Sequence, residues 1–168
     1  MVIAHKDYQP IEYIIPKEIL KTAGFKITVA SDLSGMATSS SGQSEKIDLV
    51  LKDVVVSDFD GVVFIGGSGA WDFLNNEISY RIIRGAAEEN MVLGAICISP
   101  RILASAGVLK GKKVTGWNGD EELANVLNKA GAIYMDQSVV VDGNLVTASG
   151  PSAAEEFGKK LVDILSVS

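Results

Sequence analysis

The sequence has very little cysteine and histidine: among its 168 residues, Cys97 is the only cysteine and His5 the only histidine. A single cysteine cannot form a disulfide within the chain, and one cysteine with one histidine cannot build a Cys/His zinc cluster. Lone free thiols are typical of proteins in reducing compartments. We therefore expect a cytoplasmic protein that holds no metal ion.

Positive charge and long apolar runs are also scarce. Lys and Arg number 15 against 21 Asp and Glu, which leaves a net charge of −6. We expect no nucleic-acid partner, because nucleic-acid binding needs a basic surface. No apolar run approaches the ~20 residues that cross a bilayer, and the start, MVIAHKDY, lacks the apolar stretch of a signal peptide. We expect no membrane partner either.

Extended polar tracts are absent, the chain holds only four prolines, and 47% of its residues are hydrophobic. This composition predicts one domain with a substantial core over residues 1–168. Short β-rich runs alternate with amphipathic stretches, which predicts an α/β fold: a doubly wound, mostly parallel sheet with helices on both faces and a small β-hairpin. We predict strands at residues 2–5, 25–30, 60–65, 91–97 and 112–116, with strand-like alternation at 47–56, a flexible connection or protruding hairpin at 31–46, a hairpin turn at Asp142-Gly143, and helices at 11–22, 78–90, 100–106, 121–129 and 153–165.

Cys97 stands at the joint between a predicted strand and a predicted helix, in the stretch VLGAICISPRILASAG. The apolar run before it is typical of a strand buried on both faces. Pro100 suits the first turn of a helix, and Gly107 suits the residue just past its end. A free cysteine is most often a small buried hydrophobe. At a helix start, however, the N–H groups and dipole would lower the pKa of the thiol and could hold an oxyanion, so a reactive role is the alternative.

Glu12 and a glycine-rich turn are the other features with chemical potential. Glu12 precedes Pro16 by four residues, so the helix should loosen where the proline lacks an N–H; a solvated first-turn carboxylate is the alternative. The turn GGSG at 66–69 ends an apolar strand, and the carboxyl ends of parallel strands meet at one edge, so it should face Cys97. It lacks the dinucleotide fingerprint and the P-loop lysine. We therefore expect no nucleotide and no cofactor.

The order of these pieces resembles the PfpI/ThiJ superfamily, whose flavodoxin-like fold is shared with class I glutamine amidotransferases. The resemblance rests on E12-x-x-x-P16 followed by AGFKITVAS, on DGVVFIGGSGA, on GAICISPRILASAGVLKGKKVT and on VVVDGNLVTASGP. It implies a reactive cysteine at Cys97, a partner carboxyl at Glu12, and an oxyanion pocket formed by the amides of Gly67 and Ile98. It also implies a homodimer or higher homo-oligomer, with residues 31–46 as an assembly element.

Further residues are candidates to line the same pocket. They are Gly66, His5, Trp71, Trp117 and Pro151. A carboxylate beside a thiolate is repulsive, so one member of the Cys97–Glu12 pair should hold a proton and the two should titrate as a unit. A protonated Glu12 that donates to the sulfur would stabilise the thiolate.

The sequence departs from the resemblance where an imidazole is expected. Members described as peptidases carry a histidine directly after the cysteine, where this chain has Ile98, and other members carry one after the next strand, where it has Gly116 and Trp117. Three functions remain open. The first is a glyoxalase- or deglycase-type enzyme for small reactive carbonyls, with a Cys97 thiolate assisted by Glu12. The others are a non-enzymatic redox sensor or chaperone, and an intracellular cysteine peptidase acting on peptides.

Overall fold

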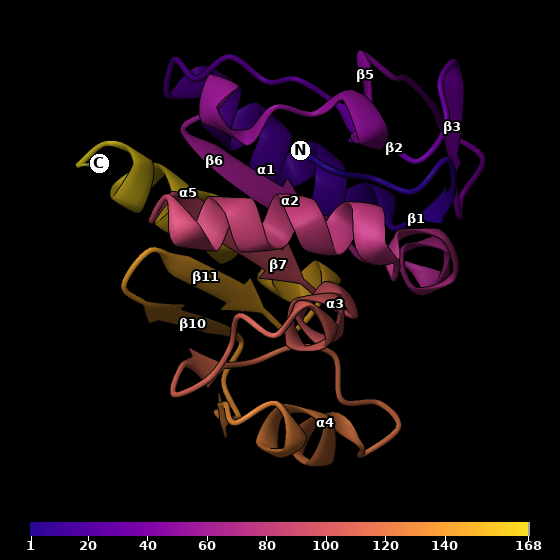
Figure 1. Cartoon of the computed structure of the whole chain (residues 1–168). Coiled ribbons are helices and arrows are strands. Elements are labelled where there is room, and N and C mark those ends of the chain that lie inside the picture. The colour runs from indigo at the N-terminus through magenta and orange to yellow at the C-terminus, as the bar shows by residue number, and fades with distance from the viewer. Residues whose placement is uncertain (168) are drawn as a thin grey trace.

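A parallel sheet runs through the middle of the computed structural model, which describes residues 1–167 (Figure 1). Its strands are hydrogen-bonded in the order β10–β11–β7–β6. β6, β7 and β11 are parallel, and β10 pairs antiparallel with β11 through a two-residue turn. The bounds are Gly61–Phe64 for β6, Val92–Ile96 for β7, Val139–Asp142 for β10 and Leu145–Ala148 for β11.

The sheet continues past β6 through the first residues of the chain. The Val2 amide donates to the Val63 carbonyl (2.7 Å) and the Ile3 amide to the Ala30 carbonyl (3.0 Å), so this segment lies between β6 and β2 (Ala30–Ser31). β2 in turn pairs with β5 (Leu49–Val50). The predicted strand at 2–5 is thus reduced to a bridge at Val2.

The other predicted strand that shortens is 25–30, of which only Ala30 belongs to β2. The Val29 amide donates to the Asp48 carboxylate (2.8 Å) instead of to a neighbouring strand, so the ladder ends there. The prediction of strand structure over residues 47–56 is also wrong beyond β5. Two single 3₁₀ turns, Leu51–Asp53 and Val56–Asp58, follow β5, because carbonyls of this segment accept hydrogen bonds from amides three residues later.

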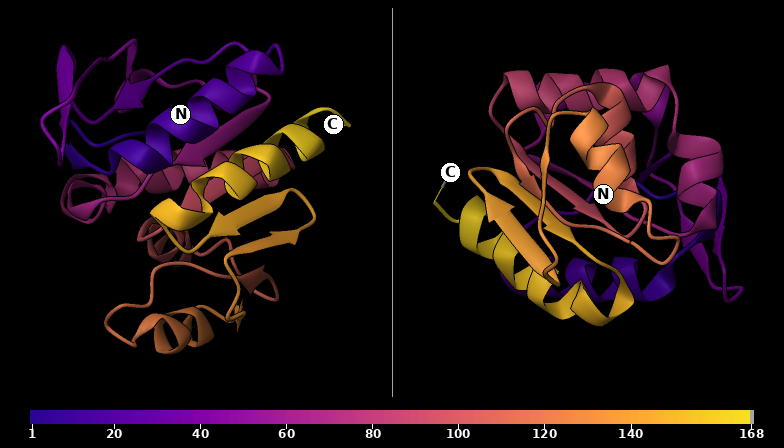
Figure 2. Two further views of the ribbon diagram at one scale, coloured as in Figure 1. Left: turned by 180° about the vertical axis from the view of Figure 1, so that it is seen from behind. Right: turned by 90° about the horizontal axis from the view of Figure 1, so that it is seen from below.

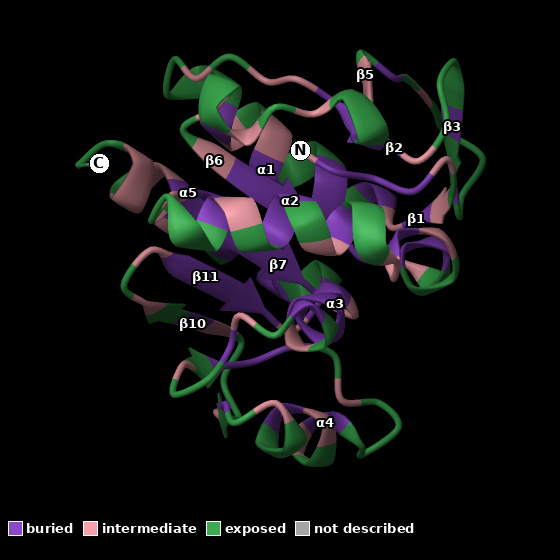
Figure 3. Ribbon diagram, in the orientation of Figure 1, coloured by how far each residue is buried: buried purple, intermediate pink, exposed green. Residues whose placement is uncertain are grey.

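Helices cover both faces of the sheet, as Figure 2 shows, and this confirms the predicted fold class. On β6, Val62 and Phe64 pack toward one side, while Val63 and the next residue after the strand, Ile65, pack toward the other. Both sets are buried, and Figure 3 shows the strands buried between the helical layers. The helices are α1 (Pro10–Thr22) and α5 (Ala154–Leu165) on one face, and α2 (Glu77–Glu88) and α3 (Ser99–Ala106) on the other.

Smaller elements surround this sandwich. The hairpin predicted as one option for 31–46 is present as β3 (Met36–Ser39) and β4 (Ser44–Lys46), and β3 also pairs with β1 (Lys6–Tyr8), a strand absent from the prediction. A single π-helical turn, Ala70–Leu74, follows the glycine-rich turn and was likewise not predicted. Near the other edge lie β8 (Lys113–Val114), β9 (Ile133–Tyr134) and α4 (Leu123–Lys129), and a 3₁₀ turn, Pro151–Ala153, precedes α5.

The carboxyl ends of β6 and β7 meet at one edge, which brings the segment after Phe64 beside the segment after Ile96. α3 begins at Ser99 with Pro100 in its first turn and ends before Gly107, whose φ of 82° lies in the left-handed region. No helix within residues 1–167 combines the length and apolarity that a membrane crossing requires.

Candidate functional site

Cys97 occupies a strained turn between β7 and α3. Its φ is 64°, in the left-handed region that costs a non-glycine residue roughly 1–2 kcal/mol. Both of its backbone groups are fixed: its amide donates to the Ala148 carbonyl (2.9 Å), and its carbonyl accepts from the Trp117 amide (2.7 Å). The neighbouring strand and loop therefore hold Cys97 in this conformation, and its side chain is partly buried.

Glu12 reaches the same edge from α1, on the other side of the sheet. The Gln9 side chain caps the helix and Pro10 begins it, which places Glu12 in the first turn. The side chain is fully buried, which excludes the solvated first-turn carboxylate. Its Oε2 accepts a hydrogen bond from the Gly66 amide (3.0 Å), while Oε1 has no hydrogen-bond partner within residues 1–167. A buried carboxyl with one unpaired oxygen is thus held beside the glycine-rich turn.

The two glycines of that turn are required by close approach. A Cβ on Gly66 would lie 2.5 Å from both the Cys97 Cβ and the Glu12 Oε2. A Cβ on Gly67 would lie 2.5 Å from the Asp7 carbonyl oxygen, and Gly67 also has a φ of 106°. Glycine at both positions therefore lets the thiol, the carboxyl and the turn pack together.

Burial and mutual repulsion dominate the electrostatics of the pair. Burial raises the pKa of Glu12 to about 7, against the opposing effects of the Cys97 thiol and the Gly66 amide. Burial raises the pKa of Cys97 to about 12, with further contributions from the charge and hydrogen bonding of Glu12. The nearby amides of Gly67 and Ile98 oppose this rise without reversing it.

The expectation that the helix start lowers the pKa of Cys97 is therefore wrong for this structure. The amides act in the expected direction, but removing the sulfur from water beside a carboxylate outweighs them. At neutral pH the Cys97–Glu12 pair carries at most one negative charge, because the second ionisation would place two charges side by side in a buried site.

The other predicted lining residues fall in different places. His5 Nδ1 lies 2.6 Å from Asp32 Oδ2, and its ring packs against Phe73 at 4.3 Å, so its observed side-chain interactions are with Asp32 and Phe73 rather than with the thiol. Trp71 is exposed on the π-helical turn. Pro151 is exposed too, but it follows Gly150, whose added Cβ would lie 3.9 Å from Glu12 Oε1.

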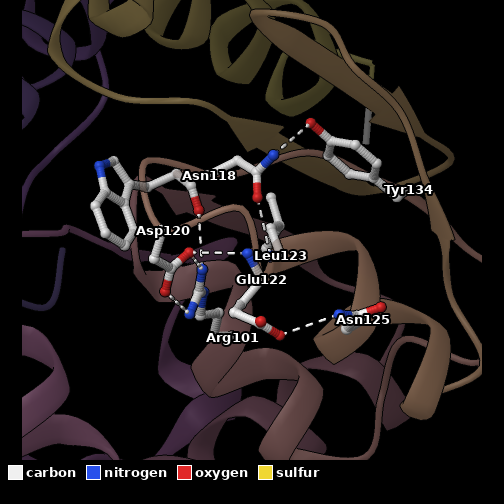
Figure 4. Close-up of polar contacts among 8 residues, drawn as sticks. Arg101, Asn118, Asp120, Glu122, Leu123, Asn125 and Tyr134 are labelled. Carbon is white, nitrogen blue, oxygen red and sulfur yellow. Dashed lines mark hydrogen bonds and ion pairs between the residues drawn. The ribbon is translucent and has the colours of Figure 1, made fainter.

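A polar cluster that involves the first turn of α3 was not predicted from the sequence (Figure 4). Arg101, in the first turn of α3, donates two hydrogen bonds to Asp120 at 2.9 Å and 2.6 Å, and its guanidinium lies 5.4 Å from the centre of the Trp117 ring. The Arg101 guanidinium holds the pKa of the Asp120 carboxyl below its usual range. The spacing of 19 residues between the two partners follows no helical or strand period, so sequence patterns offered no signal for the pair.

Two other kinds of site that a fold can offer are a ligand cavity and a metal centre. A cavity of about 300 Å³, with Met1, Phe25 and Asp60 among its lining residues, lies at the amino ends of the strands, away from Cys97. Within residues 1–167 no group of three or more His, Cys, Asp or Glu side chains is placed to hold a metal ion. The Cys97–Glu12 pair is the candidate that combines a nucleophile with a perturbed carboxyl.

Comparisons with known proteins show the family of the chain and agree with its fold. The model of the DJ-1/PfpI family matches residues 1–164. The chain is 38% identical to uncharacterized protein MJ0967 of Methanocaldococcus jannaschii over 96% of this chain and 79% of that protein. It is 33% identical to deglycase PfpI of Pyrococcus furiosus over 98% of each. The crystal structure of a ThiJ/PfpI domain protein from Brachyspira murdochii superposes with a TM-score of 0.93 at 30% identity, covering 99% of this chain and 95% of that chain.

Proposed function

The chain belongs to the DJ-1/PfpI family, and on that premise we propose that it is a cofactor-independent enzyme acting on small reactive carbonyls through Cys97 and Glu12. The observation that carries the proposal is the placement of a strained cysteine beside a buried carboxyl whose pKa is raised to about 7. General acid–base groups work best when their pKa lies near the working pH. The deglycase name of a relative of similar length supports the same substrate class.

The first step follows from the protonation state of the pair. Above about pH 7 Glu12 is ionised and the Cys97 thiol keeps its proton. Glu12 then takes the thiol proton as the sulfur forms a bond to the aldehyde carbon, and the π electrons of the carbonyl move to its oxygen. Glu12 returns the proton to that oxygen, which yields a neutral hemithioacetal. The hemithioacetal then isomerises to a thioester, as the hydrogen on its sulfur-bearing carbon is transferred to the neighbouring carbonyl carbon, and hydrolysis of that thioester by water releases lactate, a proton and the free thiol. No oxidant or cofactor is needed, because methylglyoxal and water together have the composition of lactic acid.

The developing oxyanion has two candidate donors. The amides of Gly67 and Ile98 lie near the sulfur and belong to turns that cannot easily move, because Gly67 is packed against the Asp7 carbonyl. Preorganised backbone N–H groups of this kind are worth about 10²–10³ in rate. We assign them the oxyanion role in this proposal.

A peptidase is less well supported. Cysteine peptidases activate their thiol with an adjacent imidazole, and the sole imidazole of this chain is engaged with Asp32 and Phe73. The carboxyl of Glu12 suits proton transfer during addition to an aldehyde.

The proposal is tested by following methylglyoxal consumption and lactate formation by NMR with the full chain and its variants. Cys97→Ala should reduce turnover to the uncatalysed level while the thermal unfolding midpoint stays within a few degrees. His5→Gln is the matched control, because it removes the only imidazole and should leave turnover intact. Equal rates for wild type and Cys97→Ala would overturn the proposal. Loss of activity in folded His5→Gln would show that the His5 imidazole, and not Glu12 alone, is needed for proton transfer.

A further inference from the structure

The backbone of Trp117 lies against the backbone of Cys97. The Trp117 amide donates to the Cys97 carbonyl at 2.7 Å, so the residue begins directly against the strained turn. A Cβ on the preceding Gly116 would lie 3.0 Å from that same carbonyl, so the two segments are in close contact. The Trp117 side chain nevertheless remains 39% exposed. The segment that contacts the Cys97 backbone therefore carries an exposed aromatic surface.

Two contacts fix where the indole lies. The Arg101 guanidinium is 5.4 Å from the ring centre, within the range of a cation–π interaction. On the other side of the loop, a Cβ on Gly119 would lie 2.6 Å from Trp117 Cζ2 and 2.9 Å from Nε1. The backbone of Gly119 therefore packs against the indole so closely that even a methyl group would displace it.

The Arg101 side chain is itself held in one position. It is 8% exposed, and Asp120 binds it through both carboxylate oxygens. Asp120 Oδ1 also accepts from the Glu122 amide (3.1 Å), and Asn118 Oδ1 accepts from the Leu123 amide (2.9 Å) at the start of α4, as Figure 4 shows. These bonds tie the loop from Trp117 to Glu122 to α3 and α4.

The charge of the loop also matters for what it can bind. Asp120 neutralises Arg101 through a bidentate ion pair, so the cation behind the indole is not free to attract an anionic substrate. The loop that contacts the Cys97 backbone then offers a flat aromatic ring without net charge. Such a ring binds planar, apolar groups by offset stacking or edge contacts.

We propose that Trp117 is a specificity-determining residue that favours aryl-substituted α-oxoaldehydes over aliphatic ones, with Arg101 and Asp120 as its positioning residues. The inference rests on the proposed function of Cys97 and Glu12 and names the substrate class of that site. Phenylglyoxal and methylglyoxal are the matched probes, because water converts them to mandelate and lactate through the same bond changes.

The kinetic test compares kcat/KM for the two aldehydes. Trp117→Ala should lower the phenylglyoxal-to-methylglyoxal ratio by about 3- to 10-fold, the range expected for one lost aromatic contact. Gly119→Ala should lower the ratio in the same direction, because it displaces the indole without removing it. Phe25→Leu is the control, since it alters an aromatic residue in the cavity at the amino ends of the strands, away from Cys97, and it should leave the ratio unchanged. An unchanged ratio in folded Trp117→Ala would overturn the inference.

A binding test separates this inference from the proposed function. Mandelate and lactate are titrated by ligand-observed NMR into the Cys97→Ala variant, which cannot form the covalent bond. Mandelate should bind about 3- to 10-fold more tightly than lactate, and Trp117→Ala in the same background should remove the difference. If the wild type shows no turnover but this binding preference is present, the proposed function is wrong while the role of Trp117 in aryl recognition is supported. Equal binding of the two acids would overturn that role of Trp117, whatever the kinetics show.

Discussion

Two carboxyl groups, Glu12 beside the strained cysteine and Asp120 in the loop after β8, have pKa values that shift in opposite directions. Glu12 is buried beside an amide and a thiol, and within residues 1–167 no cationic side chain forms an ion pair with it, so its pKa rises to about 7. Asp120 is more exposed and is bound by Arg101, so its pKa falls below the usual range. The first group can exchange a proton at neutral pH and costs the fold stability. The second stays ionised and organises a loop. Pairing and burial, more than residue type, set the direction in which the pKa of each of these carboxyls shifts.

The sharpest test of that contrast removes each charge in turn. Glu12→Gln should lower kcat/KM for methylglyoxal by about 10²–10⁴-fold, the usual contribution of a general base. Asp120→Asn should lower it by less than about threefold, because the bond it loses is several residues from the thiol. Steady-state kinetics on both variants provide the measurement. A comparable loss in the two would show that the contrast between the carboxyls has no functional meaning.

The second prediction concerns stability as a function of pH. The pKa of Glu12 is about 7 in the fold against its ordinary value of 4.5, so the folded protein binds the extra proton between these values. The stabilisation is fully present below pH 4.5 and is lost as pH rises through about 7. Relative to wild type, Glu12→Gln should therefore gain up to about 3 kcal/mol of unfolding free energy between pH 4.5 and pH 8.5. Urea unfolding at the two pH values measures this gain, and a wild-type and variant pair with parallel pH profiles would contradict it.

The third prediction concerns the rate as a function of pH. Glu12 must lose its proton before it can accept one from Cys97, so kcat/KM for methylglyoxal should rise as pH increases through about 7. Below that point the rate should fall about tenfold per pH unit. Asp120→Asn should leave the midpoint in place. A flat profile between pH 5.5 and pH 8 would show that Glu12 does not act as the base.

The smallest effect is expected at the Arg101–Asp120 pair. In a Trp71→Phe background, where Trp117 is the only indole, Asp120→Asn should raise acrylamide quenching of the fluorescence by roughly twofold, as for a modest and partly exposed ion pair. Sodium chloride at high concentration should raise quenching in the parent and change the variant little, because salt screens exposed pairs. Identical quenching in the two proteins would mean that Gly119 and the Cys97 carbonyl position the indole without the ion pair.

The position of the turn that holds Cys97, between β7 and α3, could be predicted from the residues around it. Pro100 and Gly107 mark the start and end of α3, and the apolar run before Cys97 marks β7, so the joint falls where the sequence predicts. The direction of the Cys97 pKa could not be predicted, because a helix start is visible in a sequence while the depth of burial beside another chain segment is not. The prediction of a strand over residues 25–30 was wrong for a related reason. The Asp48 carboxylate accepts the hydrogen bond of the Val29 amide, where a carbonyl of a neighbouring strand was expected to accept it.

The contact between the first and last helices of the structure has a consequence for the order of folding. A Cβ on Gly158 in α5 would lie 3.0 Å from the Cα of Pro16 and 3.0 Å from Ile19 Cδ1, so the helix that carries Glu12 rests against α5. Contacts so distant along the chain form only after the intervening loops have closed. The helix that carries Glu12 therefore reaches its final packing late in folding, and its carboxyl is placed beside Cys97 only as the fold closes.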